Sequence, residues 1–221
     1  MLDYNVRRAE DLTPGQIDEM VALCIRSFDT TDVISDAFTG CNRALVDPSF
    51  RSRIRAGIHS GTVYLAQDKS DRILAFAVCS GPGKSMYSTQ EQRELGYDQL
   101  VNDMSPETRD WLKNTYAPKV SGILSEEVLG VTSIDAWFVN LLVTDSAFKR
   151  QGLARAVLDA VDQRHRQAIA DKTAVALCAN KEIFRDIYLR LGFQVKGQVD
   201  MPSPAGTWPI FALTRTPSPS G

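Results

Sequence analysis

The chain has 221 residues, 43% of them hydrophobic and 24% charged, and its formal net charge is −2 at pH 7. This composition allows a full apolar core, and the lack of a basic surplus argues against nucleic acid as a partner, because phosphates need cations to neutralise them. No apolar run approaches the roughly 20 residues that cross a bilayer, and the N-terminus lacks the apolar segment of a secretory signal, so we expect a cytoplasmic protein without membrane contact.

The first 80 residues are predicted to alternate short strands with helices. Polar residues 68–71 separate two apolar runs and so predict a hairpin. The predicted elements are a strand at 4–8, a helix from about 11 to 28, an irregular stretch at 32–47, a helix from Pro48, and strands at 62–66 and 72–78.

Residues 81 to 133 differ in character, with polar helical stretches at 89–100 and 106–116. Pro118, Gly122 and Gly130 are predicted to interrupt them. We interpret this region as a helical insertion across one face of a sheet, where it would form part of a substrate pocket.

One motif in this region resembles a nucleotide-binding loop. Gly81-Pro-Gly-Lys-Ser85 follows a strand and is similar to the end of a phosphate-binding loop. That motif also requires a glycine at position 78, which is Val78, and no Mg²⁺-binding aspartate follows a second apolar strand. A solvated turn is the preferred interpretation.

The C-terminal third begins with a strand–helix–strand unit. Residues 135–144 are an apolar strand of the type buried on both faces, residues 152–170 a helix, and residues 173–179 a second strand. A βαβ unit of this kind requires parallel strands and a right-handed crossover.

A second helix and a hairpin follow. The helix spans 181–191, with Ile183, Ile187 and Leu191 as its inward stripe, and Gly192 ends it as a left-handed cap. Pro209 lacks an N–H and predicts that the last strand is an edge or bulged strand. The hairpin strands are 193–201 and 207–214; residues 1–215 are predicted to form one domain and 216–221 a disordered tail.

The cysteines and histidines give no support for a metal site. His59 and His165 are far apart, which leaves little for a zinc site or a Ser-His-Asp triad. The cysteines show no CxxC spacing and lie in or beside apolar stretches, where a free thiol behaves as a small hydrophobe. We therefore expect no metal and four buried thiols: Cys24, Cys41, Cys79 and Cys178.

The link between the buried strand and the first helix of this unit has the features of an anion site. A helix N-terminus offers unpaired N–H groups and a partial positive charge. Gly152 carries no Cβ, so a phosphate can approach the backbone, and Lys149, Arg150 and Arg155 place cations around it, which suits a pyrophosphate. On this loop alone, a solvated basic turn is an equal alternative. The GxGxxG fingerprint is absent, which argues against a nicotinamide or flavin.

The segment Leu141-Leu-Val-Thr-Asp-Ser-Ala-Phe-Lys-Arg-Gln-Gly-Leu-Ala154 resembles the cofactor motif of the GCN5-related N-acetyltransferases. That motif reads Gln or Arg, two variable residues, Gly, one variable residue, then Gly or Ala. Lys149 stands where Gln or Arg is usual, and Ser146 where Pro is common. Downstream, Asn180 and Tyr188-Leu-Arg-Leu-Gly-Phe193 resemble the family's second motif, with one residue more between Asn180 and Tyr188 than usual. The resemblance covers 135–214 well, 1–80 only in the order of elements, and 81–133 hardly at all.

The resemblance implies an α+β fold, a three-layer α/β/α sandwich around a mixed, mostly antiparallel sheet with a splayed central parallel strand pair (the acyl-CoA N-acyltransferase fold). Coenzyme A would lie in the splay, with its pantetheine arm bonded to the backbone of Leu142 and Thr144, which flank Val143. The remaining cofactor contacts implied are the pyrophosphate-binding residues Lys149, Arg150, Gln151, Gly152, Leu153 and Ala154, with Arg155 nearby, and then Asn180 and Tyr188.

The activity implied is direct attack of an amine on acetyl-coenzyme A, with a small-molecule amine as the expected acceptor. A bulge would direct the Leu142 N–H at the thioester carbonyl, and the Tyr188 phenol would protonate the leaving thiolate. The alternatives are a non-catalytic sensor or scaffold that binds coenzyme A, and an N-acetyltransferase of proteins or peptides.

No residue matches a general base cleanly. Phe138 and Asn140 are expected to share a strand face with Leu142, and neither is a base. Asp135 and the pair Glu126-Glu127 are the nearest candidates, although surface carboxylates are common and a water chain would also serve.

Overall fold

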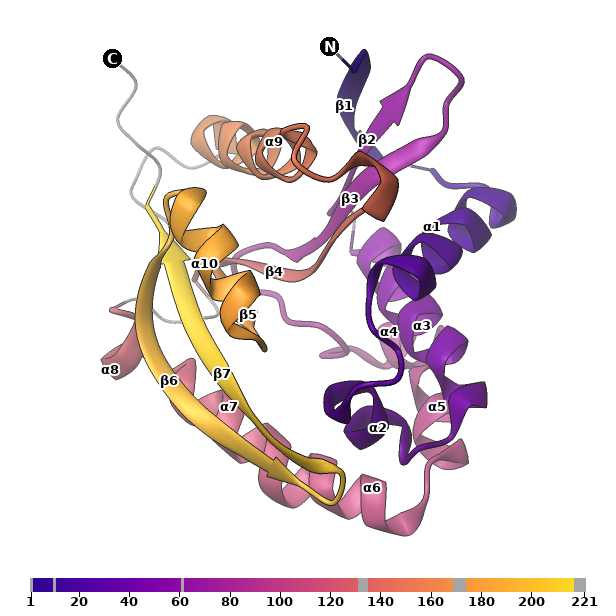
Figure 1. The fold of residues 1–221 in the computed structure, drawn as a ribbon, viewed down its shortest axis with the longest axis vertical. Coiled ribbons are helices and arrows are strands. Elements are labelled where there is room, and N and C mark those ends of the chain that lie inside the picture. The colour runs from indigo at the N-terminus through magenta and orange to yellow at the C-terminus, as the bar shows by residue number, and fades with distance from the viewer. Residues whose placement is uncertain (1, 10, 61, 131–134, 169–173, 217–221) are drawn as a thin grey trace.

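The computed structural model describes the chain except for residues 1, 10, 61, 131–134, 169–173 and 217–221. Within the described residues, a seven-stranded sheet in the order β1-β2-β3-β4-β5-β7-β6 forms the middle layer (Figure 1). Neighbouring strands are antiparallel except β4 and β5, which are parallel. The strands are β1 Tyr4–Ala9, β2 Val63–Asp68, β3 Ile73–Ser80, β4 Trp137–Thr144, β5 Val175–Ala179, β6 Gln194–Ser203 and β7 Gly206–Arg215.

Helices cover both faces of this sheet, so the predicted three-layer sandwich with a mixed sheet is confirmed. Helices α1 and α3 pack on β2 to β4 on one face, and α9 packs on the other. The helices are α1 Pro14–Ser27, α2 Val33–Thr39, α3 Val46–His59, α4 Gln90–Glu94, α5 Tyr97–Asp103, α6 Pro106–Trp111, α7 Ala117–Ile123, α8 Glu126–Leu129, α9 Leu153–Ala168 and α10 Glu182–Arg190; the single turns η1 Arg43–Leu45 and η3 Ser146–Phe148 are 3-10 helices, and η2 Leu112–Tyr116 is a π-helix.

The N-terminal elements follow local capping chemistry. Thr13 and Gln16 form a capping box at the start of α1, with Pro14 in its first turn. The stretch predicted as irregular contains α2, because Asp32 accepts a hydrogen bond from the Ser35 N–H (2.9 Å) and Gly40, at φ 60°, ends the helix. The sequence analysis did not predict this short helix, and the signal for it is this pair of caps.

Helices α6 to α8 complete the sandwich over its C-terminal half, whereas α4 and α5 pack against α3. Figure 1 shows β6 and β7 as a long hairpin, with α10 on one side and α6 to α8 along the other. Trp111 of α6 packs against Met201 and Trp208, and its indole N–H donates to Pro202 O (2.7 Å). This part of the chain therefore supplies a structural layer to β6 and β7.

Pro118 does not end a helix, contrary to the sequence prediction. Helical backbone runs from Pro106 to Ile123, and the π-turn directly before Pro118 lets the Ala117 N–H bond to Leu112 O. Pro118 then lies in the first turn of α7, where a missing N–H costs little.

The inward stripe of α10 also differs from the prediction. Phe184, Tyr188 and Leu191 pack on the core, whereas Ile183 and Ile187 are 58% and 39% exposed. The sequence of this helix offers two pairs of apolar residues at i, i+4 spacing, Ile183 with Ile187 and Phe184 with Tyr188. The pair with the two aromatic rings is the one that packs on the core. Gly192, at φ 88°, ends the helix as predicted.

The last strand is not an edge strand. β7 lies between β5 and β6, so β6 is the edge, and the bulge of this hairpin is in β6 between Val195 and Gly197. The part of β7 that pairs with β5 begins at Phe211. Pro209 is tolerated because it lies beyond the end of β5, where β7 has a strand on one side only.

All four cysteines are free thiols, but they are not all buried. Cys24 and Cys79 are buried, Cys178 is half-buried, and Cys41 is exposed at the turn after α2. The prediction of burial was therefore wrong for Cys41. Among the described residues, no helix is both long and apolar enough to cross a membrane, and no group of three or more potential ligands could hold a metal ion.

Two helical glycines should respond oppositely to substitution by alanine. A Cβ on Gly57 of α3 would overlap the Cγ1 of buried Val78 in β3, whereas a Cβ on Gly122 of α7 would meet no described atom within 4 Å. Gly57→Ala should lower the free energy of unfolding by about 1–3 kcal/mol through overpacking. Gly122→Ala should raise it by up to about 1 kcal/mol, because alanine loses less backbone entropy. Urea denaturation of both variants measures the difference, and stabilisation by Gly57→Ala would show that α3 does not pack this closely on β3.

Candidate functional site

The central feature of the site is a β-bulge in β4. Val139 pairs with Cys79 and Leu141 with Val78, so Asn140 has no partner residue in β3. The Asn140 side-chain amide donates to Ser80 Oγ (2.8 Å), which anchors the extra residue to the end of β3.

The two parallel strands separate at this bulge. β4 pairs with β5 only through Trp137, Phe138 and Val139, whose partners are residues 175–177. From Asn140 to Thr144, β4 has β3 on one side and, among the residues that the structure describes, no strand on the other. The splayed parallel pair expected from the resemblance is therefore present.

The backbone groups of Leu142 and Thr144 face this opening. The N–H of Asp145 donates to Leu74 O (2.8 Å), which fixes the hydrogen-bond phase of the β3–β4 ladder. With Thr144 opposite Ala75 and Leu142 opposite Ala77, both β4 residues occupy non-hydrogen-bonded positions. Their N–H and C=O groups therefore point away from β3, into the space that β5 leaves.

The bulge reverses one expectation about side chains. Phe138 and Asn140 line a cavity of about 160 Å³, whereas Leu142 packs in the core cluster beneath α9. Leu141 and Val143 pack on α1 and α3. Phe138 and Asn140 do not share a face with Leu142, because the extra residue shifts the alternation of side chains by one position.

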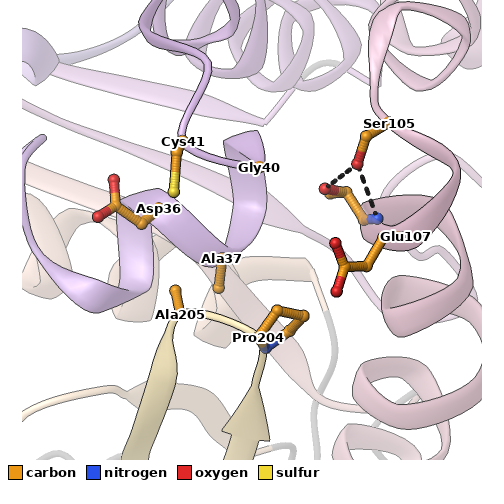
Figure 2. Close-up of a pocket in the computed structure, with 9 residues that line it drawn as sticks. Asp36, Ala37, Gly40, Cys41, Ser105, Glu107, Pro204 and Ala205 are labelled. Atoms are coloured by element: carbon orange, nitrogen blue, oxygen red, sulfur yellow. Dashed lines mark hydrogen bonds between the residues drawn. The ribbon is translucent and has the colours of Figure 1, made fainter.

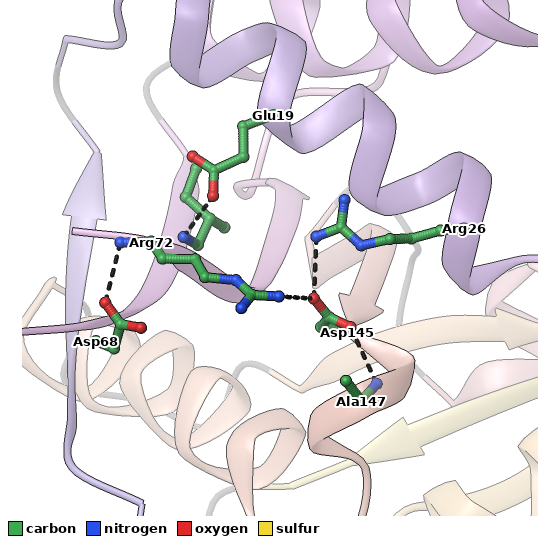
Figure 3. A network of polar contacts seen from close by, with 7 residues as sticks. Glu19, Arg26, Asp68, Arg72, Asp145 and Ala147 are labelled. Carbon is green, nitrogen blue, oxygen red and sulfur yellow. Dashed lines mark hydrogen bonds and ion pairs between the residues drawn. The ribbon is translucent and has the colours of Figure 1, made fainter. Parts of the chain in front are cut away.

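The turn after β4 is anchored by a buried carboxylate. Figure 3 shows Asp145 between two guanidinium groups: Arg26 of α1 and Arg72 each place Nη2 3.0 Å from Oδ2. The other oxygen, Oδ1, accepts a hydrogen bond from the Ala147 N–H (3.0 Å), and the Arg72 guanidinium lies 5.0 Å from the centre of the Phe148 ring. Burial of the carboxyl opposes its ionisation, but the Ala147 N–H and the two arginines outweigh burial and lower the pKa of Asp145.

The backbone of the following loop presents free amide groups. Arg150 and Gly152 have positive φ values, 64° and 84°, which turn the chain into α9. Among the described residues, no hydrogen bond uses the backbone N–H of residues 149 to 155 as its donor. The exposed turn and the first turn of α9 therefore present unpaired N–H groups, which are the donors that an anion would need.

The three cations of this loop are not equivalent. Lys149 and Arg150 are exposed, and no ion pair with a described carboxylate involves them. Arg155 instead donates to Arg190 O (2.9 Å), the last residue of α10. The guanidinium of Arg155 thereby links the start of α9 to the end of α10.

Tyr188 and Asn180 lie on the C-terminal side of the splay. Tyr188 packs edge-on against Phe193, with ring centroids 5.6 Å apart, in the same core cluster as Leu142. Burial of the phenol, and then the neighbouring Cys178 of β5, raise the pKa of Tyr188. Asn180 directly follows β5 and is half-buried, so the residues of both motifs lie on elements that border the opening.

A second, larger cavity lies away from the splayed strands. Its volume is about 300 Å³, and it lies between α2, α6 and the β6–β7 turn (Figure 2). Asp36 and Glu107 contribute carboxylates to its lining, and Asp36 forms an ion pair with Arg43 (2.7 Å). None of its described lining residues belongs to β4, β5 or α10.

Comparisons with known proteins agree with this geometry. No protein-family model matches the sequence, and no curated protein is significantly similar to it. Solved structures do match over the whole length. A histone acetyltransferase HPA2 and related acetyltransferase from Corynebacterium glutamicum has a TM-score of 0.61 at 17% identity, with 100% of both chains covered.

Two insect enzymes match equally well. Arylalkylamine N-acetyltransferase 2 from Aedes aegypti has a TM-score of 0.64 at 12% identity, covering 96% of this chain and 98% of that chain. Polyamine N-acetyltransferase from Drosophila melanogaster has a TM-score of 0.64 at 13% identity, covering 97% and 100%. The chain has the fold of the GCN5-related N-acetyltransferases. In this fold the bulged β4, its splay from β5 and the loop into α9 lie together, as the sequence motifs implied.

Replacing the buried carboxylate should reveal its contribution through pH. Because the pKa of Asp145 is lower in the folded chain than the unfolded value of about 3.9, the carboxylate stabilises the fold above that pH. Its contribution is lost as the pH falls through the folded pKa. Asp145→Asn should therefore lower the free energy of unfolding by about 1–3 kcal/mol at pH 7, and by less as the pH approaches 3.

Urea denaturation of both proteins between pH 3 and pH 7 measures this difference. The control is Asp3→Asn, which removes an ion pair between two exposed side chains, Asp3 and Lys69, and should change stability little. A cost of Asp145→Asn that does not change with pH would contradict the assigned role of the charge.

Proposed function

We propose that the chain is an acetyl-coenzyme-A-dependent N-acetyltransferase that acetylates a small-molecule amine. The observation that carries this proposal is that three features follow one another along residues 140 to 155: a bulge, an unpaired strand edge and free loop amides. An extended pantetheine arm can bond to such an edge as an added strand, and a pyrophosphate can bind such amides. Structural neighbours named for arylalkylamines, polyamines and agmatine support a small amine as acceptor.

The cofactor contacts follow the order of the chain. The pantetheine arm would bond to the backbone of Leu142 and Thr144, beside Val143. Asn180 and Tyr188 would border the arm on the α10 side, and Arg155 would hold the two helices together around it. The pyrophosphate would bind the amides of Lys149, Arg150, Gln151, Gly152, Leu153 and Ala154.

The reaction requires one bond to form and one to break. The neutral amine nitrogen attacks the thioester carbonyl carbon, so that the C–N bond forms and the C–S bond breaks. The Leu142 N–H would stabilise the oxyanion, an effect worth roughly 3–4 kcal/mol in related acyl transfer. The Tyr188 phenol would give its proton to the departing thiolate, and the amine would lose one proton to water.

A non-catalytic coenzyme-A-binding role is the second candidate. It is favoured by the cavity at the bulge, where Phe138 and Asn140 supply no base and no described carboxylate lines the wall. Free thiol released from acetyl-coenzyme A in the presence of an amine panel separates the two. Tight cofactor binding without thiol release would support the sensor.

A cytoplasmic location remains a prediction.

Substitution of the loop glycine tests the cofactor site. Gly152 and Gly130 have similar positive φ values, 84° and 73°, and a Cβ on either meets no atom of the described residues closer than 3.9 Å. Both alanine variants should therefore lose similar stability, about 1 kcal/mol. By calorimetry, coenzyme A should bind the wild type and Gly130→Ala equally well. Gly152→Ala should bind it roughly tenfold more weakly, because the new Cβ and the strained turn displace the amides from the phosphates. If the wild type takes up no coenzyme A, the proposal is wrong.

Tyr188→Phe tests the proposed acid. Phenylalanine keeps the ring contact with Phe193 but has no proton to donate, so kcat at neutral pH should fall about 100-fold with little change in coenzyme A affinity. Because burial raises the pKa of Tyr188, its deprotonation should not limit the rate in the neutral range. Tyr97→Phe, on α5, is the matched control and should keep full activity. Unchanged turnover in Tyr188→Phe would assign Tyr188 to packing alone.

A further inference from the structure

Helix α3 carries one half-buried cation whose charge no described carboxylate balances. Arg51 bonds to Asp47 (2.7 Å) and Asp18 (2.5 Å), and Arg55 is exposed to solvent. Arg53 lies between them in sequence and is half-buried, and none of the ion pairs among the described residues includes it. A partly desolvated guanidinium without a counter-charge is unfavourable until an anion binds to it.

The surroundings of Arg53 are aromatic. Its guanidinium carbon lies 5.7 Å from the centre of the Phe38 ring of α2. Burial raises the pKa of Tyr87, and the charge of Arg53 opposes that rise. Tyr116, in the π-turn η2, packs edge-on against Phe38, with ring centroids 4.9 Å apart. Arg53 therefore faces a group of aromatic side chains that come from three different segments.

This aromatic group leads toward the proposed acid. Burial raises the pKa of Tyr116 to about 12, Cys178 adds to the rise, and Arg53 opposes it. Cys178 of β5 also adds to the rise in the pKa of Tyr188. Phe38, Tyr116 and Cys178 pack against one core cluster, so the aromatic group around Arg53 reaches the strand that borders the splay. The unbalanced cation and the end of the splay belong to one region of the molecule.

The cavity at the bulge also contains a cation and no described carboxylate. Lys84 contributes a cation to its wall, and the rest of the lining is apolar or uncharged, including Phe138, Met86 and Leu124. The loop Gly81–Ser85, which resembles a nucleotide-binding loop in sequence, supplies Lys84 here. Tyr87 directly follows Met86 of this wall, and its hydroxyl lies 2.9 Å from Oγ of Ser52, the residue before Arg53. No described carboxylate lines the cavity, so nothing in it would attract a purely cationic amine.

We propose that the acceptor amine also carries a carboxylate, and that Arg53 binds this carboxylate while apolar and aromatic side chains contact the body of the acceptor. This inference rests on the proposed function and names its substrate class. A planar guanidinium suits a carboxylate because it can donate two parallel hydrogen bonds. Lys84, in the wall of the cavity, adds a second positive charge. The chemistry is the acyl transfer described above; the carboxylate takes no part in bond making.

Matched acceptor pairs test the proposal with the full-length chain and acetyl-coenzyme A. The pairs are phenylalanine with phenethylamine, and 4-aminobutanoate with butylamine, which differ only in the carboxylate. Thiol release should give a kcat/KM roughly 10- to 100-fold higher for the carboxylated member of at least one pair. Arg53→Gln should abolish this preference by lowering kcat/KM for the acid alone, and Arg53→Lys should keep part of it. Arg55→Gln is the control on the same helix and should behave as wild type.

The outcomes separate this inference from the proposed function. If the wild type acetylates plain amines as well as or better than the acids, or if Arg53→Gln lowers both members equally, the inference is wrong and the acetyltransferase proposal stands. If coenzyme A does not bind, or no amine of either kind releases thiol, the proposed function fails and the inference fails with it. Unchanged coenzyme A affinity in Arg53→Gln shows that the variant is folded.

Discussion

The extra residue in β4 is the constraint on which the rest of the site depends. Asn140 breaks the alternation of the strand, so that Val139 packs under α9 while Leu141 packs on α1 and α3. The same irregularity coincides with the last residue that pairs with β5. A regular β4 would continue along β5 and would satisfy its own backbone groups. The bulge instead leaves Leu142 and Thr144 with donors and acceptors that only a ligand or water can satisfy.

The loop that follows β4 is anchored at its start by Asp145 and leaves its later backbone N–H groups unpaired. Asp145 is 3% exposed and bonds to arginines from α1 and from the start of β3, so the entrance to the turn is tied to two distant segments. Because two guanidinium groups neutralise this carboxylate, it does not weaken the positive character of the exposed loop beyond it. The amides of residues 149 to 155 can therefore stay unpaired without the loop losing its position.

The local motifs could be predicted from the sequence, whereas features that depend on distant partners could not. The apolar run 135–144 and the glycine at 152 identify the strand, the turn and the helix, because each signal lies within a few residues. The place of the bulge depends on pairing with β3, about 60 residues earlier. Which face of α10 is buried was ambiguous, because Ile183 and Phe184 each begin a pair of apolar residues at i, i+4 spacing. Arg53 could not be recognised at all, since its aromatic neighbours come from three separate segments. The catalytic role of Tyr188 stays a prediction that its burial permits.

The hydrogen bond from Arg155 to the end of α10 has a mechanical consequence. It joins the helix that follows the exposed loop to the helix that carries Tyr188, so the two helix ends cannot separate without breaking this contact. In the proposed complex, this contact would help to set the distance between the loop amides and the Tyr188 phenol. A thioester would reach the phenol only when the length of its arm matches that distance, whatever acyl group it carries.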